Sequence, residues 1–217
     1  MPDFPARRTM MVDTQVRPSD VTKFPIIDAM LTIPREEFVP TAQREVAYVG
    51  ENIDLGGGKV MLEPRTLAKM LDALDISGDE LVLDVGGGYG YSSAVIARMA
   101  EAVVMVDDDE NLIAEAQETL SNFGADNVIV HQGGLSEGAA QHGPYDVIVV
   151  QGGIVEFPED LTAQLKEGGR VACLFVQNAL GEVRIGRKHN GEITWRMSFN
   201  ANAPILKGFE NTSEFKL

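Results

Sequence analysis

The residues that could perform chemistry gather in one segment, 81–91, with the sequence LVLDVGGGYGY. An apolar run containing a single acid, Asp84, leads into the glycines, after which the pattern becomes helical at Tyr91. A glycine-rich turn at the carboxyl edge of a parallel sheet lets the backbone pass close to a ligand, because no side chain stands in the way. The segment therefore predicts a site for a nucleoside-containing cofactor, lined by Gly86, Gly87, Gly88 and Gly90.

The glycine spacing indicates which cofactor is bound. Gly86, Gly88 and Gly90 form G-x-G-x-G, whereas dinucleotide enzymes use G-x-G-x-x-G after a strand. Asp84 would repel a pyrophosphate, but a carboxylate can accept hydrogen bonds from an ammonium group. S-adenosylmethionine carries an ammonium and a sulfonium and no phosphate. The pattern therefore fits this molecule better than NAD.

A second acid supports this interpretation. Asp107 ends the next predicted strand, about 20 residues beyond the glycines, where an acid can accept hydrogen bonds from both ribose hydroxyls. Asp108 follows it, and its side chain or backbone would lie beside the adenine. Each residue alone could be a solvated carboxylate at the end of a strand. Their order along the chain favours nucleoside-cofactor binding.

The bulk composition is that of a globular chain. It has 217 residues, of which 44% are hydrophobic, enough to bury one substantial core. No apolar run approaches the roughly 20 residues needed to cross a bilayer. The N-terminus, MPDFPARRTMMVD, lacks the apolar stretch of a secretory signal and is expected to be a loose lead-in. A cytoplasmic location is the expectation.

Charge and reactive side chains narrow the possible partners. A net charge of −15 would repel phosphate backbones and anionic lipid, so neither nucleic acid nor membrane is expected as a partner. Cys173 is the only cysteine, which excludes intrachain disulfides, and its apolar surroundings predict burial. The three histidines, His131, His142 and His189, lack metal-ligand spacing, so no metal site is expected.

The first part of the chain is expected to be helical and irregular. Residues 20–31 have apolar positions at helical spacing, and Pro64 is expected to begin another helix. Between them, residues 50–59 are glycine-rich and predict a flexible connector. We expect residues 1–75 to form an extension that covers the active site. Residues 76–217 would then form the cofactor-binding domain.

From residue 80 onward, strands and helices alternate. The run DVIVV at 146–150 is continuously apolar, as in a strand covered on both faces. Asn190-Gly191 lies between two alternating segments and predicts a type I′ hairpin. The fold class is therefore α/β, an open, doubly wound, mostly parallel sheet with a C-terminal antiparallel hairpin and an N-terminal helical extension. Further strands are predicted at 81–85, 103–107, 128–131 and 170–176, and helices at 91–100, 110–123 and 161–165.

Several motifs resemble the protein-L-isoaspartate O-methyltransferase family. AMLTIPREEFVP (29–40) resembles its N-terminal helix and loop, and LVLDVGGGYGYSSAVIA its cofactor motif. YDVIVVQGG with FPEDLTAQLKEGGRV resembles its later strand, helix and strand. The N-terminal segment makes the match specific, since the glycine motif alone indicates only a methyltransferase.

The resemblance implies a Rossmann-like fold, S-adenosyl-L-methionine as cofactor, and protein repair by methylation of a damaged aspartyl carboxylate in proteins or peptides. It also implies roles for individual residues. Asp107 would take the ribose, while Gly133 and Gln151 would line the cofactor and substrate mouth. The methionine part and the sulfonium would be cradled by Asp84, Gly86, Gly88 and Gly90.

The chain departs from the family pattern at the expected substrate site. The family carries a serine in T-x-S-Q-P, and here Leu62 occupies that position and cannot donate a hydrogen bond. Glu63 replaces the glutamine and adds negative charge beside a site for a carboxylate. Gly134 stands where the family pattern G-D-G has aspartate. No catalytic residue is therefore assigned, and activity on isoaspartate is expected to be impaired or redirected.

Alternatives remain open at this point. Like charges at Glu63 and the substrate would repel by about 1–4 kcal/mol in a poorly screened pocket. Nearby residues could offset this charge, namely Lys59, Arg65 or Thr66.

The chain could be a divergent relative that binds the cofactor but acts on another acceptor, or a non-catalytic binding module. A nicotinamide-dependent oxidoreductase is the third alternative, and the Gly-Tyr-Gly end of the turn speaks against it.

Overall fold

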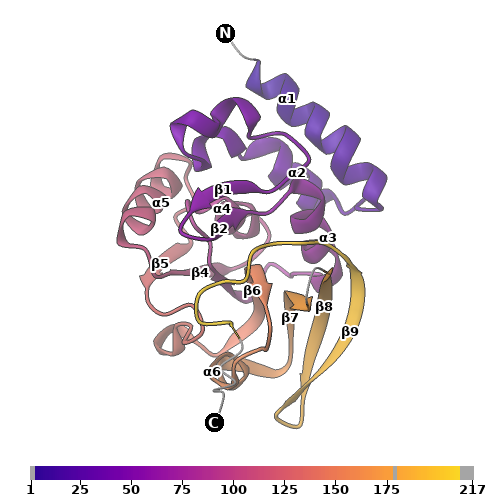
Figure 1. The fold of residues 1–217 in the computed structure, drawn as a ribbon, viewed down its shortest axis with the longest axis vertical. Coiled ribbons are helices and arrows are strands. Elements are labelled where there is room, and N and C mark those ends of the chain that lie inside the picture. Colours follow the sequence, from indigo (N-terminus) through magenta and orange to yellow (C-terminus); the bar gives the residue numbers. More distant parts are fainter. Residues whose placement is uncertain (1–2, 178–179, 211–217) are drawn as a thin grey trace, which may run out of the picture.

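The computed structural model describes residues 3–177 and 180–210 (Figure 1). Its centre is a seven-stranded sheet with the strand order β5-β4-β3-β6-β7-β8-β9. Neighbouring strands from β5 to β7 run parallel, whereas β8 and β9 are antiparallel. This arrangement confirms the predicted fold class. The strands are β3 (Leu81–Val85), β4 (Ala102–Asp107), β5 (Val128–Gln132), β6 (Tyr145–Ile154), β7 (Leu165–Gln177), β8 (Leu180–His189) and β9 (Glu192–Asn200).

Successive residues of the central strands point to opposite faces, and each face has its own core. Val82 and Val147 belong to one cluster, whereas Leu83 and Ile148 belong to the other. Residues of α3, α4, α5 and the N-terminal helices complete the first cluster, and Leu161 of α6 lies in the second. The helices are α3 (Pro64–Leu74), α4 (Tyr91–Ala97), α5 (Glu110–Asn122) and α6 (Glu159–Gln164), with a short η5 (Ala140–His142).

The N-terminal residues form helices, so the predicted loose lead-in is wrong. Helix α1 begins after Asp3, whose carboxylate accepts a hydrogen bond from the backbone N–H of Ala6, with Pro5 in the first turn. Met30 of α2 shares a core with the sheet, and the division at residue 75 stays a prediction. The segments are α1 (Phe4–Met11), η1 (Val12–Val16), η2 (Arg17–Ser19), α2 (Phe24–Thr32), η3 (Arg35–Phe38) and η4 (Thr41–Val46).

The glycine-rich segment 50–59 is also ordered, which corrects the prediction of a flexible connector. It contributes to an antiparallel hairpin of β1 (Ile53–Gly56) and β2 (Lys59–Met61), in which Ile53 pairs with Met61. The side chains of Ile53 and Leu55 on β1 are buried, and β2 contacts β6 of the main sheet. Figure 1 shows the hairpin lying next to α4, at the edge of the sheet where the parallel strands end.

The C-terminal hairpin forms as predicted. Asn190 and Gly191 both have positive φ, 52° and 83°, as a type I′ turn requires. Trp195 of β9 packs edge-on against Phe157 and Phe175. Some element bounds differ from prediction: α4 ends at Ala97 rather than at residue 100, β6 continues to Ile154, and β7 begins at Leu165 rather than at residue 170. Among the described residues, no helix combines the length and apolar character needed to span a membrane.

Candidate functional site

The turn between β3 and α4 requires glycine at the predicted positions. Gly86, Gly88 and Gly90 have φ of 77°, 58° and 93°, a region that residues with a side chain rarely adopt. Gly90 caps α4. An added Cβ at Gly88 would lie only 2.6 Å from Cδ1 of Leu55, so the hairpin rests directly on the turn.

Asp84 is buried beside this turn and is held by three side chains. Its Oδ2 accepts hydrogen bonds of 2.6 Å from the hydroxyls of Ser92 and Ser93, at the start of α4. Its Oδ1 accepts one of 2.7 Å from Nε2 of Gln151 on β6. Burial raises the pKa of Asp84, against the lowering effect of these hydrogen bonds. The structure thus brings the predicted residues Asp84 and Gln151 together, in a network that joins β3, α4 and β6.

Asp107 lies at the end of β4, within reach of the glycine turn. Its Oδ2 accepts a hydrogen bond of 3.1 Å from the backbone N–H of Gly88, and its backbone oxygen accepts one of 3.0 Å from Gly133. The ammonium of Lys59, on β2, binds the carboxylates of both Asp107 and Asp108. Five residues from four segments therefore meet at one point.

Lys59 is the site residue whose position the sequence leaves open. It is one of three residues near Glu63 that could offset its charge, but it binds the acids at the end of β4 instead. Burial lowers the pKa of Lys59, and the hydrogen bonds and charges of Asp107 and Asp108 outweigh this effect and raise it. No local sequence pattern pairs Lys59 with Asp107, which lies 48 residues further along the chain.

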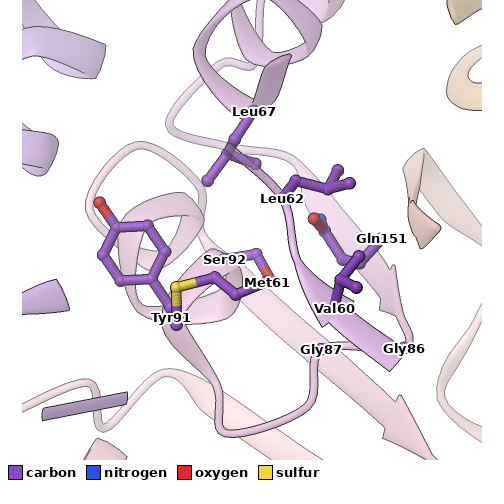
Figure 2. Close-up of a pocket in the computed structure, with 9 residues that line it drawn as sticks. All are labelled: Val60, Met61, Leu62, Leu67, Gly86, Gly87, Tyr91, Ser92 and Gln151. Atoms are coloured by element: carbon purple, nitrogen blue, oxygen red, sulfur yellow. The ribbon is translucent and has the colours of Figure 1, made fainter. Parts of the chain in front are cut away.

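The expected substrate segment forms an apolar wall. Figure 2 shows Leu62 and Leu67 beside Val60 and Met61, across a small cavity from the glycine turn. The volume of this cavity is about 10 Å³. Its polar lining groups include Ser92 and Gln151, and both bind Asp84.

The backbone of the substrate segment is fixed by a buried arginine. Nη2 of Arg35 donates a hydrogen bond of 2.8 Å to the carbonyl of Leu62, and Nε donates one of 2.7 Å to the carbonyl of Ala47. The guanidinium lies 4.8 Å from the centre of the Tyr91 ring. This cation–π contact ties the segment to α4.

The negative charge of Glu63 is partly offset by its own helix. The hydroxyl of Thr66 donates a hydrogen bond of 2.6 Å to Glu63, and Nη1 of Arg65 lies 3.7 Å from the same carboxylate. The backbone N–H of Glu63 donates to the side chain of Asn52, which precedes the hairpin. Thr66 and Arg65 therefore offset the charge of Glu63, whereas Lys59 does not.

The remaining reactive side chains do not form a second centre. Cys173 is fully buried, and burial raises its pKa well above the ordinary value, so the thiol is inert. The rings of His131 and His142 lie edge to face. Within residues 3–177 and 180–210, no group of three or more His, Cys, Asp or Glu side chains could hold a metal ion. The Gly134 carbonyl accepts from the N–H of Glu137, in a turn.

The side chains around the glycine turn have the right chemistry for a cationic nucleoside compound, but the cavity is too small to hold one. Carboxylates at the ends of β3 and β4 flank a turn of left-handed glycines, as S-adenosyl-L-methionine would require. Ligand pockets of small-molecule sites have volumes of roughly 300–1,000 Å³. The cavity of about 10 Å³ is far smaller, because the hairpin covers the turn. In this conformation the hairpin therefore leaves no room for the cofactor.

Comparison with known proteins identifies one consistent set of relatives. The family described as protein-L-isoaspartate(D-aspartate) O-methyltransferase matches residues 7–201. Protein-L-isoaspartate O-methyltransferase 2 of Pelobacter propionicus is 35% identical, over 83% of this chain and 82% of the relative. Protein-L-isoaspartate O-methyltransferase of Koribacter versatilis is 35% identical, over 88% of this chain and 86% of the relative. A solved protein-L-isoaspartate O-methyltransferase structure superposes with a TM-score of 0.81 at 26% identity, covering 93% of this chain and 66% of the other.

Proposed function

Because this chain belongs to the protein-L-isoaspartate(D-aspartate) O-methyltransferase family, we propose that it methylates the carboxylate of damaged aspartyl residues in proteins or peptides. The methyl donor is S-adenosyl-L-methionine, which supplies an activated methyl group when bound. One observation supports the proposal above all: buried acids at the ends of β3 and β4 flank a turn whose glycines have positive φ.

We assign the cofactor contacts from this geometry. Asp107 would accept hydrogen bonds from the ribose hydroxyls, and the neighbouring Asp108 would lie by the adenine. Asp84 would act by fixing the turn, since both of its oxygens are engaged by protein donors. The close approach of the methionine part would use the glycines, with Gly133 and Gln151 at the mouth. The proposed contact residues are Gly86, Gly87, Gly88, Gly90, Asp107, Asp108, Gly133 and Gln151, and Asp84 would position the turn.

Transfer to a carboxylate needs alignment more than proton transfer. The attacking oxygen is already anionic, so the protein contributes by holding it in line with the methyl group and by excluding water. Leu62 and Leu67 provide a dry wall for this purpose. They provide no hydrogen bond to orient the substrate, and we expect slower transfer to isoaspartate than the family pattern would support.

The apolar wall favours a second candidate function. A chain in which Leu62 replaces an orienting hydroxyl, and Glu63 adds charge, could bind the same cofactor and methylate a less polar acceptor. A neutral acceptor would avoid repulsion by Glu63 and would need no donor from residue 62.

The test is transfer of labelled methyl groups from S-adenosyl-L-methionine to an isoaspartyl peptide, followed as release of labelled methanol from the ester. The same peptide with ordinary aspartate is the control. Label on the isoaspartyl peptide alone supports the proposal. Binding of the cofactor without any ester would exclude isoaspartate and leave the second candidate.

A further inference from the structure

Hairpin β1–β2 covers the glycine turn with its own side chains. Leu55 rests on Gly88, and Val60 and Met61 line the small cavity next to the turn (Figure 2). Lys59 is buried, and its ammonium lies on the carboxylates of Asp107 and Asp108. The hairpin thus presents a cation and apolar groups at the positions where a bound nucleoside would need room.

Leu206, which lies in the core on the other face of the sheet from the cavity, is fixed by backbone hydrogen bonds. Leu206 packs against Gly86 and Gly152. The N–H of Gly153 donates to the carbonyl of Pro204 at 2.8 Å, and the N–H of Leu206 donates to the carbonyl of Gly153 at 2.9 Å. This segment is therefore an extension of the sheet, and space is more readily made on the hairpin side.

The two strands of the hairpin are joined at both ends, and its tip is unobstructed. Its tip is Gly56–Gly58, three residues with φ of 86°, 61° and 80° and open space around each. At its base, Asn52 accepts a hydrogen bond from the N–H of Glu63 and so joins the two ends. Among the described residues, Lys59 is the one hairpin side chain that forms an ion pair.

We propose that hairpin β1–β2 is an autoinhibitory lid, latched by Lys59, which occupies Asp107 in place of the cofactor ribose. Cofactor binding then requires Lys59 to leave Asp107 and the lid to lift from the glycine turn. The ammonium and the ribose hydroxyls compete for one carboxylate, because Asp107 already accepts hydrogen bonds from Gly88 and Asp109. The inference rests on the proposed function, which assigns the ribose to Asp107.

Lys207 offers a matched control. Its Nζ lies 3.4 Å from Asp108, so it carries the same charge close to the same pair of acids. It lies outside the hairpin, and its side chain is 81% exposed. If charge alone controls cofactor affinity, substitution of either lysine should change that affinity. If release of the lid controls it, only substitution of Lys59 should do so.

The experiment is calorimetry with S-adenosyl-L-homocysteine on the full chain, as wild type, Lys59→Gln and Lys207→Gln. The glutamine amide can still donate to the buried Asp107, which preserves the fold. We expect Lys59→Gln to bind about tenfold tighter or more, and Lys207→Gln to stay within about threefold of wild type. Equal affinity in wild type and Lys59→Gln, or weaker binding in Lys59→Gln, overturns the latch and leaves the proposed function standing. No binding by any of the three proteins refutes the proposed cofactor, and the latch with it.

Amide hydrogen exchange without ligand tests the lid itself. Lys59→Gln should raise exchange in residues 53–61 by about tenfold and leave β3 unchanged, and Lys59→Arg should keep the wild-type rate because it keeps the ion pair. Unchanged exchange in 53–61 contradicts the latch. Rapid exchange in β3 of Lys59→Gln would mean that this variant has lost its fold, and the Lys59→Arg variant then provides the test. Fast exchange in residues 53–61 of Lys59→Arg, which retains the charge, also overturns the proposal.

Discussion

Nε2 of Gln151 donates a hydrogen bond of 2.7 Å to Oδ1 of Asp84, which joins β6 to β3 across the floor of the site. The acceptor is fully buried, so it depends on protein donors for solvation. Gln151 belongs to the extended end of β6, beyond the strand predicted at 146–150. The amide is thus part of the support of the glycine turn.

Replacing Gln151 by Leu should lower the free energy of unfolding by about 1–3 kcal/mol, because a buried carboxylate loses one of its donors. Urea denaturation measures the change. Gln141→Leu is the control, since its amide is exposed and contacts only histidine rings, and it should change stability by less than about 0.5 kcal/mol. Equal stability of wild type and Gln151→Leu would contradict this account of Asp84.

The double variant Leu62→Ser with Glu63→Gln should raise methyl transfer to an isoaspartyl peptide by about tenfold or more. It adds an orienting donor and removes a repelling charge, and a donor aimed at the reacting group can contribute about 2.7–4 kcal/mol. The measurement is the initial rate of labelled methanol release at saturating cofactor. An unchanged rate in a folded variant would show that this segment does not limit the reaction.

Each substitution alone separates the two effects. Glu63→Gln should mainly lower KM, because it removes repulsion in the bound state. Leu62→Ser should mainly raise kcat. Leu62 is buried, so its loss should also lower stability by about 2–5 kcal/mol, which thermal unfolding will reveal before the assay.

Arg35→Lys should destabilise the protein by about 2 kcal/mol despite the retained charge. A lysine cannot make both carbonyl hydrogen bonds in the same plane, nor stack as well on Tyr91. Thermal unfolding measures the loss. Arg44→Lys, at a half-exposed ion pair with Glu37, is the control and should be nearly neutral. A neutral Arg35→Lys would show that the buried planar guanidinium is not required.

Glu80 should make stability depend on pH at the acid end. Its carboxylate receives two hydrogen bonds of 2.7 Å from Arg170, which lower the pKa of Glu80 below its usual 4.5. A lowered pKa stabilises the fold above the unfolded value, and this contribution is lost as pH falls through the folded value. Glu80→Gln should therefore cost about 1–3 kcal/mol at pH 7, and progressively less below about pH 4.5.

The control for this variant is Glu51→Gln, at an exposed surface carboxylate. Its difference from wild type should stay near zero at both pH values. Urea unfolding curves at pH 7 and pH 3.5 provide the comparison. A constant difference between wild type and Glu80→Gln across this range would show that the ion pair does not contribute through ionisation.

The parts of the fold that could be predicted from sequence are those with strong local signals. Apolar runs such as Val147–Val150 identify strands buried on both faces, and Asn190-Gly191 determines the hairpin turn. The glycine turn was predictable for the same reason, since positive φ leaves little choice of residue. These features depend on neighbours in the sequence.

The errors arose where tertiary contacts override a local pattern. Glycines 56–58 favour a connector, but they form the tip of a hairpin whose strands are held by burial of Ile53 and Leu55. Helix α1 is not evident from the sequence because Asp and Pro also favour loops, whereas here Asp3 caps the helix and Pro5 lies in its first turn. The pairing of Lys59 with Asp107 joins distant segments, and no local pattern predicts it.

Leu206 has a consequence for how the chain responds to shortening. It packs on Gly86 and Gly152 because the stretch after β9 returns to the sheet and forms hydrogen bonds with Gly153. Deleting a residue between 201 and 205 would withdraw that leucine from the turn. A deletion near the C-terminus would then lower ligand affinity at a turn more than 100 residues earlier in the chain.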